Sequence, residues 1–161
     1  MANKTEITRD DIMSPEEYNA VRAERRAAMV EQKKLRRLHV GPHATFYCEN
    51  WDTMWYQIQE MLRIEKGGEA QITDELAAYN PLIPQGRELV ATLMFEIADP
   101  DRRTALLSKL GGVEDTVSLE VAGAKIAAVA DREDGVERTR SDGKTSSIHF
   151  LHFPFQANQI A

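Results

Sequence analysis

Four polar side chains recur at helical spacing in one short stretch of the sequence. On a helix over residues 52–65 they fall at i, i+3, i+4 and i+7 and share one face; they are Thr53, Tyr56, Gln57 and Glu60. We call these four residues the polar stripe. A hydroxyl, a phenol, an amide and a carboxylate can each form directional hydrogen bonds. The stripe is therefore either a partly exposed face with local hydrogen bonds, which spacing alone favours, or part of a functional site.

A strand before this helix carries further candidates for chemistry. Residues 43–49 alternate between apolar and polar types, which predicts a half-buried strand with His43 and Glu49 on its polar face. If Glu60 were buried beside them, a raised pKa would suit general acid–base catalysis. His43, Glu49 and Glu60 are thus the candidate catalytic residues. They are also the candidate ligands for a divalent metal, since a histidine with two carboxylates suits iron, manganese or zinc.

The remaining reactive residue types favour structural roles. Cys48 alternates onto the apolar face of its strand, opposite His43, so we interpret it as a buried thiol rather than a nucleophile. His149 and His152 have opposite parity on a predicted strand, so one regular strand cannot direct both to one ion. The Gly-Gly pairs lack the surrounding pattern of a nucleotide-binding loop, and no cofactor has a fingerprint in the sequence.

Composition places the chain in the ordinary globular class. Of its 161 residues, 29% are charged and 42% are hydrophobic. The net charge of −6 and the pI of about 5.3 argue against a general nucleic-acid-binding protein. No apolar run is long enough to span a membrane, and the N-terminus lacks the apolar region of a secretory signal. A single cysteine cannot form an internal disulfide. We therefore expect a cytoplasmic protein of bacterial type that binds neither nucleic acid nor membrane.

The periodicity predicts an α+β fold in one domain, 1–161. We expect a mostly antiparallel sheet of about five strands, with a long N-terminal helix and a Trp-rich helix packed on it. Residues 1–13 are expected to be a flexible tail, 131–144 a mobile loop and 156–161 a frayed C-terminus. The predicted helices are 14–38, 52–66, 71–79 and 99–110, and the predicted strands are 43–49, 88–98, the hairpin 116–121 with 125–130, and 146–153.

Several blocks of the sequence resemble a bacterial family known only as a domain of unknown function. The motifs are G-P-H at 41–43, E-N-x-D-T at 49–53, Q-I-Q-E-M at 57–61 and N-P-L-I-P at 80–84. The resemblance extends from Met13 to Phe153, although Trp51 and Trp55 replace expected polar residues. It implies a redox or peroxide-stress setting, with rubrerythrin-like or iron–sulfur proteins as partners. Together with the stripe, the motifs give a candidate binding cluster, which comprises Asn50, Asp52, Thr53, Tyr56, Gln57 and Asn80.

Two functions remain open from the sequence. The favoured one is an accessory or binding module that self-associates as a homo-oligomer and acts with redox proteins, because the chain has no recognised catalytic signature. The Trp and Met content near the stripe is also typical of an interface. The alternative is a small metal-dependent or acid–base enzyme, which would use His43, Glu49 and Glu60 for chemistry and Tyr56 and Gln57 to orient a substrate.

Overall fold

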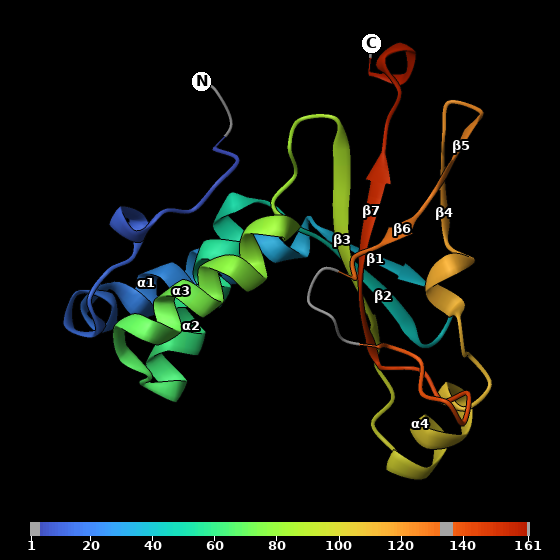
Figure 1. Ribbon diagram of the computed structural model, residues 1–161, viewed down its shortest axis with the longest axis horizontal. Coiled ribbons are helices and arrows are strands. Elements are labelled where there is room, and N and C mark those ends of the chain that lie inside the picture. The colour runs from blue at the N-terminus through green and yellow to red at the C-terminus, as the bar shows by residue number, and fades with distance from the viewer. Residues whose placement is uncertain (1–3, 133–136, 161) are drawn as a thin grey trace. The chain divides into compact units, whose positions relative to one another are not determined.

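The described residues fold into four α-helices, a five-stranded sheet and a separate two-stranded sheet (Figure 1). The computed structural model describes residues 4–132 and 137–160. They group into two compact units. We call Met1–Arg36 with Glu49–Gly86 the helical unit, and Arg37–Cys48 with Arg87–Ala161 the sheet unit. None of the described helices combines the length and the apolar character needed to cross a bilayer.

The helical unit contains three helices that begin where capping residues stand. Ser14 and Glu17 form a reciprocal capping box at the start of the first helix, as their spacing predicts. Asn50 caps the second helix through the backbone N–H of Thr53. Gly67 precedes the third. The helices are α1 (Pro15–Lys34), α2 (Trp51–Glu65) and α3 (Gly68–Tyr79), with single turns at Arg9–Asp11 and Asn80–Leu82.

The Trp-rich face of α2 forms the centre of the helical unit. Trp55 and Ile58 are buried, and the ring of Tyr18 from α1 packs edge-on against Trp55 at 6.0 Å between centroids. Trp51 stacks on Trp55 at 6.3 Å. The apolar periodicity of residues 51–62 thus identified three buried residues of this helix correctly, Met54, Trp55 and Ile58. Trp51, Met61 and Leu62 are only partly buried, whereas the polar Thr53 and Gln59 are buried too.

The residues before α1 are bound to the helical unit, although the sequence suggested a flexible tail over 1–13. The indole N–H of Trp51 donates to the carbonyl of Glu6 at 2.7 Å, and that of Trp55 donates to the carbonyl of Asp11 at 2.8 Å. Ile7 is 1% exposed. The described part of this segment, from residue 4 onwards, thus contributes to the core. No pattern in the sequence indicated this contribution, because the segment itself has little periodicity.

The sheet unit is built on five strands in the order β1-β2-β3-β7-β6, and every neighbouring pair is antiparallel. A separate hairpin, β4 with β5, turns at Ala122 and Gly123, which both have positive φ as a two-residue turn requires. The elements are β1 (Arg37–Val40), β2 (Ala44–Cys48), β3 (Glu88–Phe95), α4 (Pro100–Leu107), β4 (Ser118–Val121), β5 (Ala124–Ala127), β6 (Val129–Ala130) and β7 (Ile148–Pro154).

The α+β class and the five-stranded antiparallel sheet are confirmed, but two of the five strands differ from those predicted. The helix expected to reach Leu38 ends at Lys34, and Arg37–Val40 pairs with β2 instead. The predicted hairpin forms its own sheet, and the short β6 completes the main one. Helical periodicity was wrong over 35–38 because a neighbouring strand supplies backbone partners that no local pattern reveals.

One face of the main sheet packs on a continuous apolar core. Leu93, Leu151 and Phe153 are among its buried members, and Ala44 and Phe46 pack against it from β2. Cys48 lies on the same face of β2 and is partly exposed. His149 and His152 point to opposite faces of β7, as their parity predicted. Of the loop expected at 131–144, residues 133–136 lie outside the described part of the chain.

Candidate functional site

The E-N-x-D-T motif forms the N-terminal cap of α2. The hydroxyl of Thr53 donates to Oε2 of Glu49 at 2.5 Å and accepts from the backbone N–H of Asn50 at 2.9 Å. Asn50 Oδ1 accepts in turn from the N–H of Thr53. Thr53 is 1% exposed. Asn50 and Thr53 thus satisfy free backbone groups at a helix start, and Glu49 accepts from the hydroxyl of Thr53; this is a structural role that their spacing already allowed.

Glu60 is held in a charged hydrogen-bond network between α1 and α2. Arg22 donates to both of its carboxylate oxygens at 2.8 Å, and the hydroxyl of Tyr18 donates to Oε1 at 2.7 Å. The bonds from Arg22 lower the pKa of Glu60, with Tyr18 adding to the effect against the opposing influence of burial. Burial and the neighbouring carboxylate raise the pKa of Tyr18. The direction at Glu60 is opposite to the one that a general acid at neutral pH requires.

The other members of the candidate cluster have separate partners within the helical unit. Gln57 hydrogen-bonds Tyr79 of α3. The side chain of Asn80 forms two hydrogen bonds with the backbone of Ile7: it accepts from the N–H at 2.8 Å and donates to the carbonyl at 2.9 Å. Asp52 is exposed. Tyr56 and Asp52 line a cavity of about 460 Å³ together with Trp51 and Trp55. Burial raises the pKa of Tyr56.

The three candidate metal ligands do not belong to one unit. His43 lies in the turn between β1 and β2 of the sheet unit, where its carbonyl accepts from the N–H of Glu96 at 2.8 Å. Glu49 and Glu60 belong to the helical unit. Among the residues that the structure describes, no group of three or more His, Cys, Asp or Glu side chains could hold a metal ion. The proposed metal set stays a prediction that this arrangement does not support.

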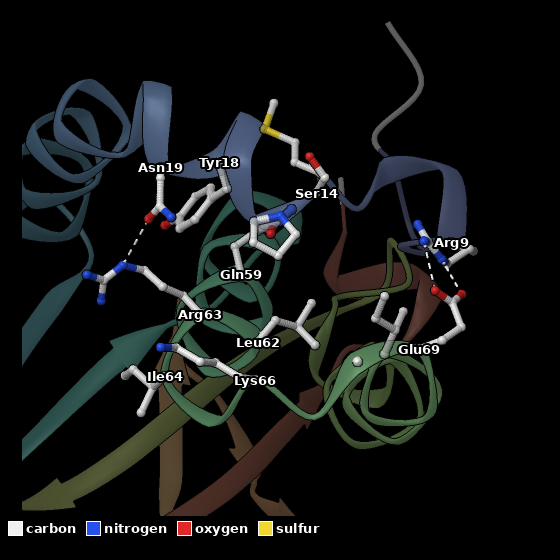
Figure 2. Close-up of a pocket in the computed structure, with 14 residues that line it drawn as sticks. Arg9, Ser14, Tyr18, Asn19, Gln59, Leu62, Arg63, Ile64, Lys66 and Glu69 are labelled. Carbon is white, nitrogen blue, oxygen red and sulfur yellow. Dashed lines mark hydrogen bonds and ion pairs between the residues drawn. The ribbon is translucent and has the colours of Figure 1, made fainter.

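A cavity of the helical unit lies between α1, α2 and the start of α3. Its volume is about 720 Å³ (Figure 2). Apolar side chains form much of its wall, among them Met13, Leu62 and Ile72. This size, with a mostly apolar wall, is typical of sites for small ligands or for one or two anchoring side chains of a partner.

A buried amide lies in the wall of this cavity. Gln59 is 2% exposed, and its Nε2 has no hydrogen-bond partner among the described residues. Leaving such a donor unpaired costs about 1–3 kcal/mol. Figure 2 shows Gln59 between Tyr18 and Leu62, on the wall that α2 contributes. An amide in this position is suited to donate to a carbonyl or carboxylate oxygen that enters the cavity.

The charged residues at the cavity give it a positive rim. Arg9 is paired with Glu69 at 2.5 and 2.9 Å. Arg63 donates from Nε to the side-chain oxygen of Asn19 at 3.2 Å, and its charge also contributes to lowering the pKa of Glu60. Lys66 also lines the cavity. The paired charges cancel, so Arg63 and Lys66 make the rim attractive to an acidic group.

Sequence reasoning missed this cavity although one signal was present. Gln59 lies four residues after Trp55 and three residues before Leu62 in the sequence. At helical spacing it therefore falls on the apolar side of α2 and not on the polar stripe. An amide among core positions is either bonded inside the protein or available to a ligand. Only the tertiary structure shows which of these two cases applies to Gln59, because the residues across the cavity come from α1 and α3.

The family model described as protein of unknown function, DUF3501, matches residues 6–161. A crystal structure of a novel protein of unknown function from Burkholderia pseudomallei is similar to this chain, with 41% identity and a TM-score of 0.86; the match covers 95% of this chain and 79% of that one. None of the curated proteins matches the chain. The resemblance that the motifs indicated is therefore confirmed, and the chain belongs to the DUF3501 family.

Proposed function

We propose that this protein is a non-catalytic accessory or binding module that acts with redox or peroxide-stress proteins, and that the cavity of the helical unit is its binding site. The observation that carries the proposal is the buried Nε2 of Gln59, which has no hydrogen-bond partner within the described part of the chain and lies in the wall of a cavity of about 720 Å³. The redox setting, the rubrerythrin-like or iron–sulfur partners and the self-association rest on the family resemblance and on the aromatic composition.

The chemistry of the wall defines what would bind there. Its apolar residues favour an apolar side chain, Gln59 favours an oxygen acceptor, and Arg63 with Lys66 favours a nearby carboxylate. A segment of a partner protein with an apolar residue next to Asp or Glu offers all three. Charge complementarity at the rim would speed association, while burial of the apolar anchor would supply most of the affinity.

An enzyme is the weaker alternative on this geometry. Arg22 donates hydrogen bonds to both carboxylate oxygens of Glu60, the candidate general acid, and the pKa of Glu60 is lowered. Glu49 is engaged by Thr53 at the helix cap. Groups so engaged are typical of structural networks, whereas an acid–base residue needs a pKa near the working pH.

The test uses a purified rubrerythrin-like protein, and separately a purified iron–sulfur protein, as the titrant in isothermal calorimetry. We expect at least one to bind, and we expect Gln59→Met to weaken that binding about tenfold, since one buried hydrogen bond is lost. Gln32→Met is the matched control: it places the same substitution on α1, outside the lining of this cavity.

Two results would contradict different parts of the proposal. If neither protein binds the wild-type chain, the redox partnership is wrong. If one binds but Gln59→Met has the same affinity as Gln32→Met, the partnership holds and the cavity is not the site. Raising the salt concentration should also weaken binding, because Arg63 and Lys66 attract the partner across solvent.

A further inference from the structure

The sheet unit has a cavity of its own, which the candidate residues did not include. Its volume is about 370 Å³, and residues from the turn before β4, from β6, from the described chain between β6 and β7, and from β7 line it. Two buried side chains in its wall carry the argument. His149 is 1% exposed and Glu114 is 6% exposed.

The tautomer of His149 follows from its hydrogen bonds. Its Nε2 lies 2.9 Å from the carbonyl oxygen of Ser146, which can only accept, so Nε2 carries the proton. The hydroxyl of Thr145 lies 3.1 Å from the same nitrogen. Burial lowers the pKa of His149, which favours the neutral ring at pH 7. Its Nδ1 is then a lone-pair acceptor.

This acceptor faces a second one. Nδ1 of His149 lies 3.8 Å from Oε2 of Glu114, and neither atom has a hydrogen-bond partner among the described residues. A neutral imidazole and a carboxylate cannot satisfy each other at these two atoms, since both only accept. Buried acceptors without a donor are costly, so the pair is suited to a ligand group that donates to both.

The charge around the pair selects a cationic donor. The carboxylates of Glu114, Asp131 and Glu137 and the guanidinium groups of Arg132 and Arg138 line the cavity. Arg132 is paired with Asp115 at 2.8 and 3.0 Å, and Oδ2 of Asp131 lies 3.5 Å from Nε2 of His152. The lining carboxylates outnumber the lining guanidinium groups, so a positive ligand is favoured.

An ammonium suits the pair better than a metal ion does. No third His, Cys, Asp or Glu joins the two groups in the described ranges to make a set that could hold a metal. A primary ammonium has three N–H donors and needs only acceptors. Phe150, whose ring lies 5.0 Å from the guanidinium of Arg138, supplies the aromatic part of the lining beside the carbon chain that bears it.

We propose that this cavity binds small primary amines, with the ammonium donating to Nδ1 of His149 and Oε2 of Glu114. The volume of about 370 Å³ accommodates an amine of several carbon atoms. This site is independent of the cavity in the helical unit, because all the residues that line it belong to the sheet unit.

The experiment follows the side-chain nitrogens of His149 by NMR in the full chain labelled with ¹⁵N. n-Butylamine, n-butanol and n-butyrate are titrated separately, so that the head group alone varies. We expect a saturable shift of Nδ1 with n-butylamine only. Glu114→Gln should weaken n-butylamine binding at least tenfold, and Glu120→Gln, at an exposed position of β4, should leave it unchanged.

Three outcomes would overturn the proposal. The first is no saturable shift of Nδ1 with n-butylamine in the wild-type chain. The second is an equal response to n-butanol, which would show that the positive charge is not recognised. The third is a shift with Zn²⁺ at concentrations where n-butylamine gives none. The wild-type comparison of amine with alcohol decides the matter even if Glu114→Gln fails to fold.

Discussion

Replacing Gln59 by Met should stabilise the free protein, which is an unusual result for a change at a buried position. The Nε2 of Gln59 is buried and unpaired among the described residues, and such a group costs about 1–3 kcal/mol. Met has nearly the same length and no polar atom to desolvate. We expect the free energy of unfolding to rise by about 1 kcal/mol, which corresponds to about 2–4 °C in Tm for a chain of this size.

The assay is urea denaturation followed by tryptophan fluorescence, because Trp51 and Trp55 both lie in the helical unit and report its unfolding. Gln71→Met is the matched contrast. The amide of Gln71 accepts from the N–H of Gly67 at 2.7 Å and donates to two carboxylates at 3.0 and 3.1 Å. Its loss should destabilise the unit by about 1–3 kcal/mol.

The unfolding free energies of Gln59→Met and Gln71→Met together show whether Gln59 has a structural role. If Gln59→Met destabilises the protein as much as Gln71→Met does, Gln59 has a structural role and the cavity argument fails. If Gln59→Met is stable but binds the partner less well, stability and binding are opposed at one side chain, which is a recurrent feature of functional sites.

Variants at three other residues test further contacts. Glu60→Gln should lower Tm by about 2–4 °C in thermal denaturation, because Arg22 loses its ionised partner; an unchanged Tm would show that the network contributes nothing. Since the pKa of Glu60 is lowered in the fold, its stabilising effect is present above the ordinary value of 4.5 and is lost as the pH falls through the folded-state pKa, so the Tm difference from Glu60→Gln should shrink in acid. The pKa of His149 is lowered as well, so its contribution is full above the ordinary value of 6.5 and declines as the pH falls below it; His149→Gln should flatten this part of the stability curve measured by urea titration. Asn80→Ala should increase hydrogen exchange at the amide of Ile7 about tenfold, with no such change at Ile83 as the control, because the side-chain acceptor of the Ile7 N–H is removed.

The sequence predicted those parts of the fold that local chemistry determines. The starts of α1 and α2 were correct because Ser14 and Asn50 cap within three residues of themselves. The end of α1 was wrong because β1 forms only by pairing with β2, which lies across a turn. The class and the antiparallel sheet could therefore be predicted, whereas the identity of the edge strands could not.

The candidate sites show the same division. The polar stripe exists as one face of α2, but its partners come from afar: Tyr18 and Arg22 lie 42 and 38 residues from Glu60. Spacing could not show that Glu60 would form an ion pair with Arg22. Nor could it show that the amide with no partner would be Gln59, one residue earlier in the sequence.

The hydrogen bonds from the two indoles and from Asn80 to the N-terminal segment reach its backbone, and this affects how its sequence can change. Trp51, Trp55 and Asn80 bind carbonyl and N–H groups of Glu6, Ile7 and Asp11, not their side chains. Substitutions at the exposed positions of the segment should therefore be well tolerated. An insertion or deletion of one residue between positions 6 and 11 would instead change the distance along the chain between the carbonyls of Glu6 and Asp11, so that both could no longer accept from the two indoles. Related chains should accordingly vary here in composition while keeping the length of the segment constant.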